Sequence, residues 1–90
     1  MTDQPATKNA LGPALADARL ALGWTPKRLA DELRKNGLVC SPKRLERIEG
    51  QQAVIKDFEV LYFCEALGVT PEALWARRES LLSPGVVEKR

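Results

Sequence analysis

The sequence predicts a compact all-α domain of five helices, and three observations support this fold class. Apolar residues recur every three or four positions along the chain, as they do on one side of a helix. A hydroxyl residue followed by proline, a common helix start, occurs at Thr25-Pro26, Ser41-Pro42 and Thr70-Pro71. Ninety residues suit a single domain with a modest core. We expect this domain at residues 10–82, between a flexible N-terminal arm (1–9) and a C-terminal tail (83–90).

The first helix of a central pair is expected from Pro26 to about Gly37. Thr25 can cap it, because its side-chain oxygen can accept a backbone N–H that the first turn leaves unpaired. Proline fits the first helical position, where no donor is needed. Apolar residues occupy one edge of this segment and charged residues cover the rest. The helix is therefore expected to bury one side only.

The second helix of the pair, at residues 42–49, has the same start signal, with Ser41 as its cap. Only Leu45 and Ile48 are apolar enough to point inward, so this helix needs neighbours to hold it in place. Its outward face is basic at the N-terminal end, which suits a polyanion. The residues expected on that face are Pro42, Lys43, Arg44 and Arg47.

Three further helices complete the predicted domain, at about residues 12–22, 57–67 and 71–82. Asp57 is expected to cap the second of these. That helix is apolar nearly all round, so it should be covered on several sides, and the side that carries Tyr62 is left for a second subunit. Trp24, just before the central pair, is expected to pack on the core rather than to stack on bases.

Charge is unevenly distributed along the chain. The formal net charge of +2 is too small to indicate a nucleic-acid partner by itself. Residues 25–56, however, contain eight Lys and Arg against four Asp and Glu, so this stretch carries +4 and the rest of the chain −2. The positive charge therefore falls on the central helix pair.

The composition argues against catalysis, metal binding and membrane insertion. The chain has no histidine, no glycine-rich phosphate loop and no serine or cysteine beside an evident base, so we expect neither an enzyme nor a cofactor. Cys40 and Cys64 lack histidine co-ligands for zinc, and we expect two free thiols rather than a disulfide. No apolar run approaches 18 residues, and the N-terminus does not resemble a secretory signal. A cytoplasmic protein is expected.

Several motifs together resemble the lambda-repressor-like helix-turn-helix family of phage repressor, Cro and XRE type. They are Leu29-Ala30, the stretch from Ser41 to Glu49 that ends Arg-Ile-Glu, and Ala66-Leu67-Gly68-Val69 followed by Glu72-Ala73-Leu74. The resemblance covers about residues 11–75. The chain departs from the family in two places: the connection from Arg34 to Cys40 is longer, and Gln51 stands where the family has glycine, with Gly50 one place early.

The resemblance implies DNA binding, with helix 42–49 as the helix that reads bases in the major groove. It also implies an ion pair between Arg19 and Glu49, against the alternative that Arg19 is a solvated surface residue. Base edges would be read by Pro42, Lys43, Arg44 and Arg47, and phosphates would be bound by Thr25, Lys27, Arg28, Ser41, Gln51, Gln52 and Lys56. The expected dimer interface comprises Tyr62, Trp75, Leu81 and Leu82.

Two functions from different classes remain after the sequence analysis. The first is a sequence-specific double-stranded DNA-binding regulator, a repressor, that acts as a homodimer. The second is a protein-interaction module on the same scaffold, an antitoxin or adaptor, that binds its partner through helix 57–67 or the C-terminal tail. Fold alone does not decide between them.

Overall fold

A computed structural model describes residues 8–82 of the chain, and these residues form five helices and no strand. The prediction of a compact all-α domain of five helices is confirmed. The arm at 1–7, the tail at 83–90 and the side chain of Leu82 lie outside the described residues. The helices are α1 (Gly12–Ala21), α2 (Pro26–Lys35), α3 (Pro42–Glu49), α4 (Asp57–Leu67) and α5 (Pro71–Leu82).

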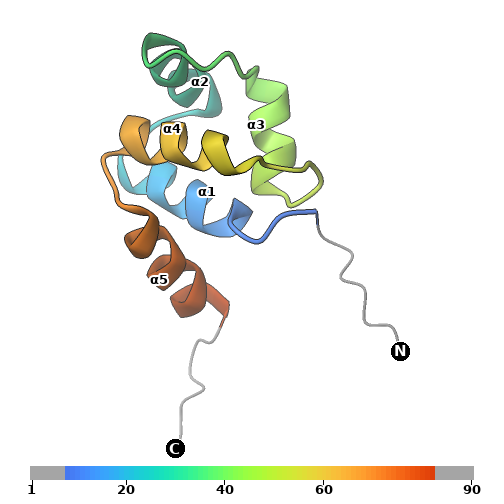
Figure 1. Cartoon of the computed structure of the whole chain (residues 1–90), viewed down its shortest axis with the longest axis vertical. Helices are drawn as coiled ribbons and strands as arrows, with labels where there is room; N and C mark the ends of the chain where they lie inside the picture. The colour runs from blue at the N-terminus through green and yellow to red at the C-terminus, as the bar shows by residue number, and fades with distance from the viewer. Residues whose placement is uncertain (1–7, 83–90) are drawn as a thin grey trace, which may run out of the picture.

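Helix α1 is central, and α3, α4 and α5 all pack against it (Figure 1). Helix α2 packs on α3 and α4, so the α2–α3 pair lies at one end of the domain and α5 at the other. One apolar core joins all five helices, as the periodicity of the sequence predicts. The largest fully buried side chains are Phe63, Leu15, Leu29, Leu33, Leu45, Ile48 and Leu74.

The helix starts follow the sequence signals in three cases and differ in one. The hydroxyls of Thr25, Ser41 and Thr70 each accept a backbone N–H from three residues further on, at 3.1 Å. Helix α4 is different, because Asp57, the expected cap, is its first helical residue and Lys56 is the cap. There the carboxylate of Glu59 accepts the backbone N–H of Lys56 at 2.9 Å.

The chain is fixed to the core earlier than predicted, at Lys8 and Asn9. The Asn9 amide donates to the carbonyls of Ile48 (2.9 Å) and Ala53 (2.8 Å), and its oxygen accepts the N–H of Gly12 at 2.7 Å. The backbone N–H of Lys8 donates to the carbonyl of Gln51 at 2.9 Å. The predicted arm of residues 1–9 therefore includes two residues that belong to the domain. They tie the start of α1 to the end of α3.

Helix α1 approaches the end of α3 so closely that only glycine fits at position 12. A Cβ there would lie 2.3 Å from the carbonyl oxygen of Ile48 and 2.8 Å from that of Glu49. A Cβ at Gly50, by contrast, would have its nearest contact at 3.4 Å, and Gly50 has an ordinary φ of −85°. A side chain is therefore excluded at Gly12 but has room at Gly50, whose nearest atoms belong to α3 itself.

We expect Gly12→Ala to lower the free energy of unfolding by about 1 to 3 kcal/mol, because the added methyl group forces α1 and α3 apart. The matched variant Gly50→Ala should change it by about 0.5 kcal/mol or less. Urea unfolding of both variants, compared at equal m values, measures the difference. Equal losses for the two variants would contradict the close approach of α1 and α3.

Candidate nucleic-acid interface

The outward face of α3 is charged and free of large apolar side chains. Leu45 and Ile48 are fully buried beneath it, as predicted. Lys43 and Arg47 are exposed, and so is Glu46, which the sequence analysis did not single out. A carboxylate between two cations changes what the face can recognise, because carboxylates accept hydrogen bonds from the cytosine amino group. The exposed residues of this face are Pro42, Lys43, Glu46 and Arg47.

A buried ion pair holds the C-terminal end of α3. The Arg19 guanidinium donates to both carboxylate oxygens of Glu49, from Nε at 2.7 Å and from Nη2 at 3.0 Å, and its Nη1 donates to the carbonyl of Trp24 at 2.6 Å. Both side chains are only 10% exposed. The hydrogen bonds to Glu49 raise the pKa of Arg19 above its ordinary value. The predicted pair is confirmed, and it ties α1 to α3.

A second ion pair holds the N-terminal half of α3 and corrects the prediction for Arg44. Its guanidinium makes two parallel hydrogen bonds of 3.0 Å to Glu59 on α4, and it also donates to the carbonyl of Val54 at 3.2 Å. The Arg44 side chain is 33% exposed and that of Glu59 only 8%. Arg44 is therefore not among the exposed residues of α3, because a buried carboxylate on the neighbouring helix binds it.

The environment of Glu59 makes the stability of the domain depend on pH. Burial alone would raise the pKa of Glu59, but the hydrogen bonds from Arg44 and from the backbone of Lys56 outweigh it and lower the pKa below its ordinary value. A carboxylate with a lowered folded-state pKa stabilises the fold fully above its unfolded-state pKa. This stabilisation is lost as the pH falls through the folded-state pKa. The Cys40 thiol beside Arg44 is buried, which raises its pKa and keeps it protonated at neutral pH.

We expect the free energy of unfolding to fall with pH below about 5, and this fall to be shallower in Glu59→Gln. The unfolded-state pKa of glutamate is about 4.3, so the window lies at and below this value. Urea titrations at a series of pH values between about 5 and 3 measure the slope. Glu79→Gln, at an exposed glutamate of α5, is the control. A slope unchanged in Glu59→Gln would show that Glu59 does not titrate abnormally.

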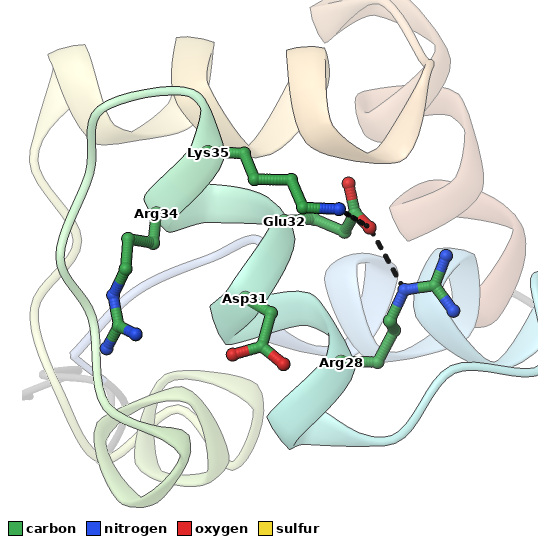
Figure 2. A pocket seen from close by; sticks show the side chains of 5 residues that line it. All are labelled: Arg28, Asp31, Glu32, Arg34 and Lys35. Atoms are coloured by element: carbon green, nitrogen blue, oxygen red, sulfur yellow. Dashed lines mark hydrogen bonds and ion pairs between the residues drawn. The ribbon is translucent and has the colours of Figure 1, made fainter.

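The exposed side of α2 carries ion pairs within the helix. Figure 2 shows Arg28 and Lys35 converging on one oxygen of Glu32 in a shallow hollow, while Arg34 extends to the other side. The hydrogen bonds from Arg28 and Lys35 lower the pKa of Glu32. Such pairs at the surface contribute little to stability. The pairs are Lys27 with Asp31 at 3.8 Å, Arg28 with Glu32 at 3.0 Å and Lys35 with Glu32 at 3.3 Å.

The predicted phosphate contacts in the loop after α3 divide into two groups. Gln51 has a left-handed φ of 61°, a conformation that glycine adopts most readily, and its amide donates to the carbonyl of Asn9 at 3.0 Å. Gln51 therefore has a structural partner, and its phosphate role is not supported. Gln52 and Lys56 are exposed beside α3. The guanidinium of Arg47 donates to the carbonyl of Gln52 at 3.3 Å, an exposed contact that brings loop and helix together.

Four of the eight basic residues of 25–56 carry no carboxylate within ion-pair distance in the described part of the chain, and four are paired. The cations without such a partner are Arg34, Lys43, Arg47 and Lys56. Three of these four cations lie on α3 or in the loop that follows it, and one lies on α2.

The predicted dimer residues lie on two separate helices. Trp75 (46% exposed) and Leu81 (43%) are on α5. Tyr62 on α4 is half-buried, and its ring meets that of Phe58 edge to face at 6.5 Å. The more exposed apolar residues of α4 are Phe58 (51%) and Leu61 (61%), neither of which was predicted at the dimer interface. We call the hollow surface lined by Phe58, Leu61, Tyr62 and Glu65 the α4 patch.

Trp24 packs against the core, as predicted, and the Arg28 guanidinium lies 4.8 Å from the centre of its ring. Among residues 8–82 there is no helix long and apolar enough to cross a membrane, and no cluster of three potential metal ligands. Comparison of the chain with protein-family models, curated proteins and solved structures gave no match.

Proposed function

We propose that this protein is a sequence-specific double-stranded DNA-binding regulator whose helix α3 enters the major groove. The supporting observation is that ion pairs fix both halves of α3 while its outer face keeps charged side chains in solvent. A rigid helix with exposed polar groups can present them to base edges at a defined angle. In this proposal Arg47 and Lys43 donate to guanine, and Glu46 accepts from cytosine.

Phosphate contacts on both sides of α3 would fix its register on the duplex. The hydroxyls of Thr25 and Ser41 accept backbone N–H groups, which leaves each hydroxyl hydrogen to donate to a phosphate. Gln52 and Lys56 serve the other side. Lys27 and Arg28 can exchange their weak pairs with carboxylates on the same helix for phosphate oxygens.

The resemblance to the lambda-repressor-like helix-turn-helix family supports the same proposal and adds a homodimer that acts as a repressor. A single domain of this size rarely contacts enough DNA for high specificity, whereas two copies would read half-sites about 34 Å apart. The exposed Trp75 and Leu81 on α5 are the residues we assign to the dimer contact, together with Tyr62.

The test compares binding to a duplex selected from random DNA with binding to a scrambled duplex, in physiological salt. We expect Arg47→Ala to lose about 1 to 3 kcal/mol of the preference between the two. The matched variant Lys56→Ala should weaken both complexes alike and reduce the slope of log affinity against log salt by about one. Equal binding of the two duplexes by the wild-type protein would refute the proposal, and equal effects of the two variants would refute the division into base and phosphate contacts.

The α4 patch favours a second candidate, a module that binds a protein partner. Phe58 and Leu61 are more than half exposed on a helix whose opposite side is buried in the core, and clustered exposed apolar residues mark contact sites. Sedimentation of the purified chain with and without duplex DNA distinguishes the candidates. A dimer that binds the duplex supports the regulator, and a monomer indifferent to DNA supports the interaction module.

A further inference from the structure

Arg44 contacts three segments around α3. Its Nη1 donates to the Cys40 sulfur, in the connection that leads into α3, at 3.4 Å. Its Nη2 donates to the carbonyl of Val54, in the loop that leaves α3, at 3.2 Å. Both nitrogens donate to Glu59 on α4 at 3.0 Å. One side chain thus joins the connection before α3, the loop after it and the neighbouring helix.

The carboxylate of Glu59 depends on this arrangement. One oxygen accepts from Arg44 and from the backbone of Lys56, and the other oxygen accepts from Arg44. The side chain is 8% exposed with Arg44 in place, so these hydrogen bonds stand in for most of its contact with water. A buried charge without its partner is strongly unfavourable. Arg44 would therefore stay with Glu59 when the outer face of α3 meets DNA.

We propose that Glu59, acting through Arg44, is a positioning residue that sets the angle of α3 and so determines DNA specificity without contacting DNA. The inference rests on the proposed function. The two parallel hydrogen bonds between Arg44 and Glu59 fix the orientation of the guanidinium. They thereby also fix the position of the first turns of α3. Lys43 and Arg47 flank Arg44 on the exposed side, so a tilt of this half of the helix moves both away from the bases they read.

The isosteric variant Glu59→Gln tests the inference, because DNA binding should change differently if Arg44 positions α3 and if Arg44 itself contacts DNA. If Glu59 positions α3, the ratio of affinities for selected and scrambled duplex falls, by about tenfold. If Arg44 is instead a DNA contact that Glu59 withholds, the variant binds DNA more tightly and its salt slope rises by about one. Tighter binding, or an unchanged ratio in a folded variant, would overturn the proposal.

A second variant covers the case in which Glu59→Gln is too unstable to assay. Arg44→Met with Glu59→Leu removes the pair without leaving a buried charge, so this variant is expected to fold. Its specificity ratio should also fall about tenfold while its salt slope stays at the wild-type value. A slope reduced by about one would show that Arg44 contacts phosphate and would overturn the inference.

Asp17→Asn is the matched control, since it weakens an arginine–carboxylate pair of similar length, with Arg77 at 2.9 Å, between α1 and α5. Its specificity ratio should equal that of the wild type.

Amide hydrogen exchange separates this inference from the proposed function, because it needs no DNA. We expect Glu59→Gln to speed exchange in residues 44–49 more than in α1. If Glu59→Gln speeds exchange in residues 44–49 but the wild-type protein binds both duplexes equally, the proposed function is refuted and the positioning of α3 by Glu59 stands. If exchange in these residues is unchanged, the positioning of α3 by Glu59 is refuted.

Discussion

Replacing Glu49 by alanine is expected to lower the free energy of unfolding by about 3 to 5 kcal/mol. The variant leaves the Arg19 guanidinium in a site where its side chain is 10% exposed, with the carbonyl of Trp24 as its remaining partner. Desolvation is then no longer offset by a charge-assisted pair. Urea unfolding at pH 7 measures this loss, which is a large part of the stability of a small domain.

Two controls separate the effect of burial from that of the pair itself. The double variant Arg19→Met with Glu49→Leu removes both charges and should recover most of the stability that Glu49→Ala loses. Asp17→Ala breaks a half-exposed pair with Arg77, in which the Asp17 side chain is 46% and the Arg77 side chain 33% exposed, and should cost about 1 kcal/mol or less. Equal losses in Glu49→Ala and Asp17→Ala would show that burial adds nothing to the Arg19–Glu49 pair.

The helices were predictable because their signals are local. Thr25 and Ser41 cap a helix through a bond to an N–H three residues away, so sequence spacing contains the whole interaction. The buried residues Leu45 and Ile48 were likewise fixed by spacing within one short helix. The position of Gln51 could be inferred as unusual from the family pattern, and its left-handed φ gives the physical reason.

The partners of Arg44 and Asn9 could not be predicted, because their contacts join segments far apart in the chain. Arg44 and Glu59 are 15 residues apart, and Asn9 and Ala53 are 44 apart. The residues around an arginine in the sequence do not show whether its side chain is exposed or is paired with a carboxylate far along the chain. One signal was present: α4 is apolar apart from the three acids Asp57, Glu59 and Glu65, and an acid that such a helix buries needs a cation.

The same limit applies to charge. The surplus of +4 in residues 25–56 treated all eight basic residues as equal, whereas Lys27, Arg28, Lys35 and Arg44 are paired with carboxylates. The count therefore located the positive region but overstated how many of its basic residues lack a carboxylate partner. Glu46, one of the four acids in that count, lies on the exposed side of α3 and offsets part of the positive charge of this face.

Phe63→Ala is expected to lower the free energy of unfolding by about 3 to 5 kcal/mol, and Phe58→Ala by about 1 kcal/mol or less. Both residues lie on α4, but Phe63 is fully buried and Phe58 is 51% exposed, so the first change leaves a cavity and the second does not. The small cost at Phe58 is the loss of its edge-to-face contact with Tyr62.

Urea unfolding of the two alanine variants gives the difference, with unchanged m values as the check on two-state behaviour. Similar losses for both would mean that Phe58 is covered, as it would be if the α4 patch were the interface of a stable dimer. In that case the loss at Phe58 would grow with protein concentration, whereas the loss at Phe63 would not, because only an interface contributes a term that depends on the concentration of its partner. A concentration series thus decides whether the apolar side of α4 acts within one chain or between two.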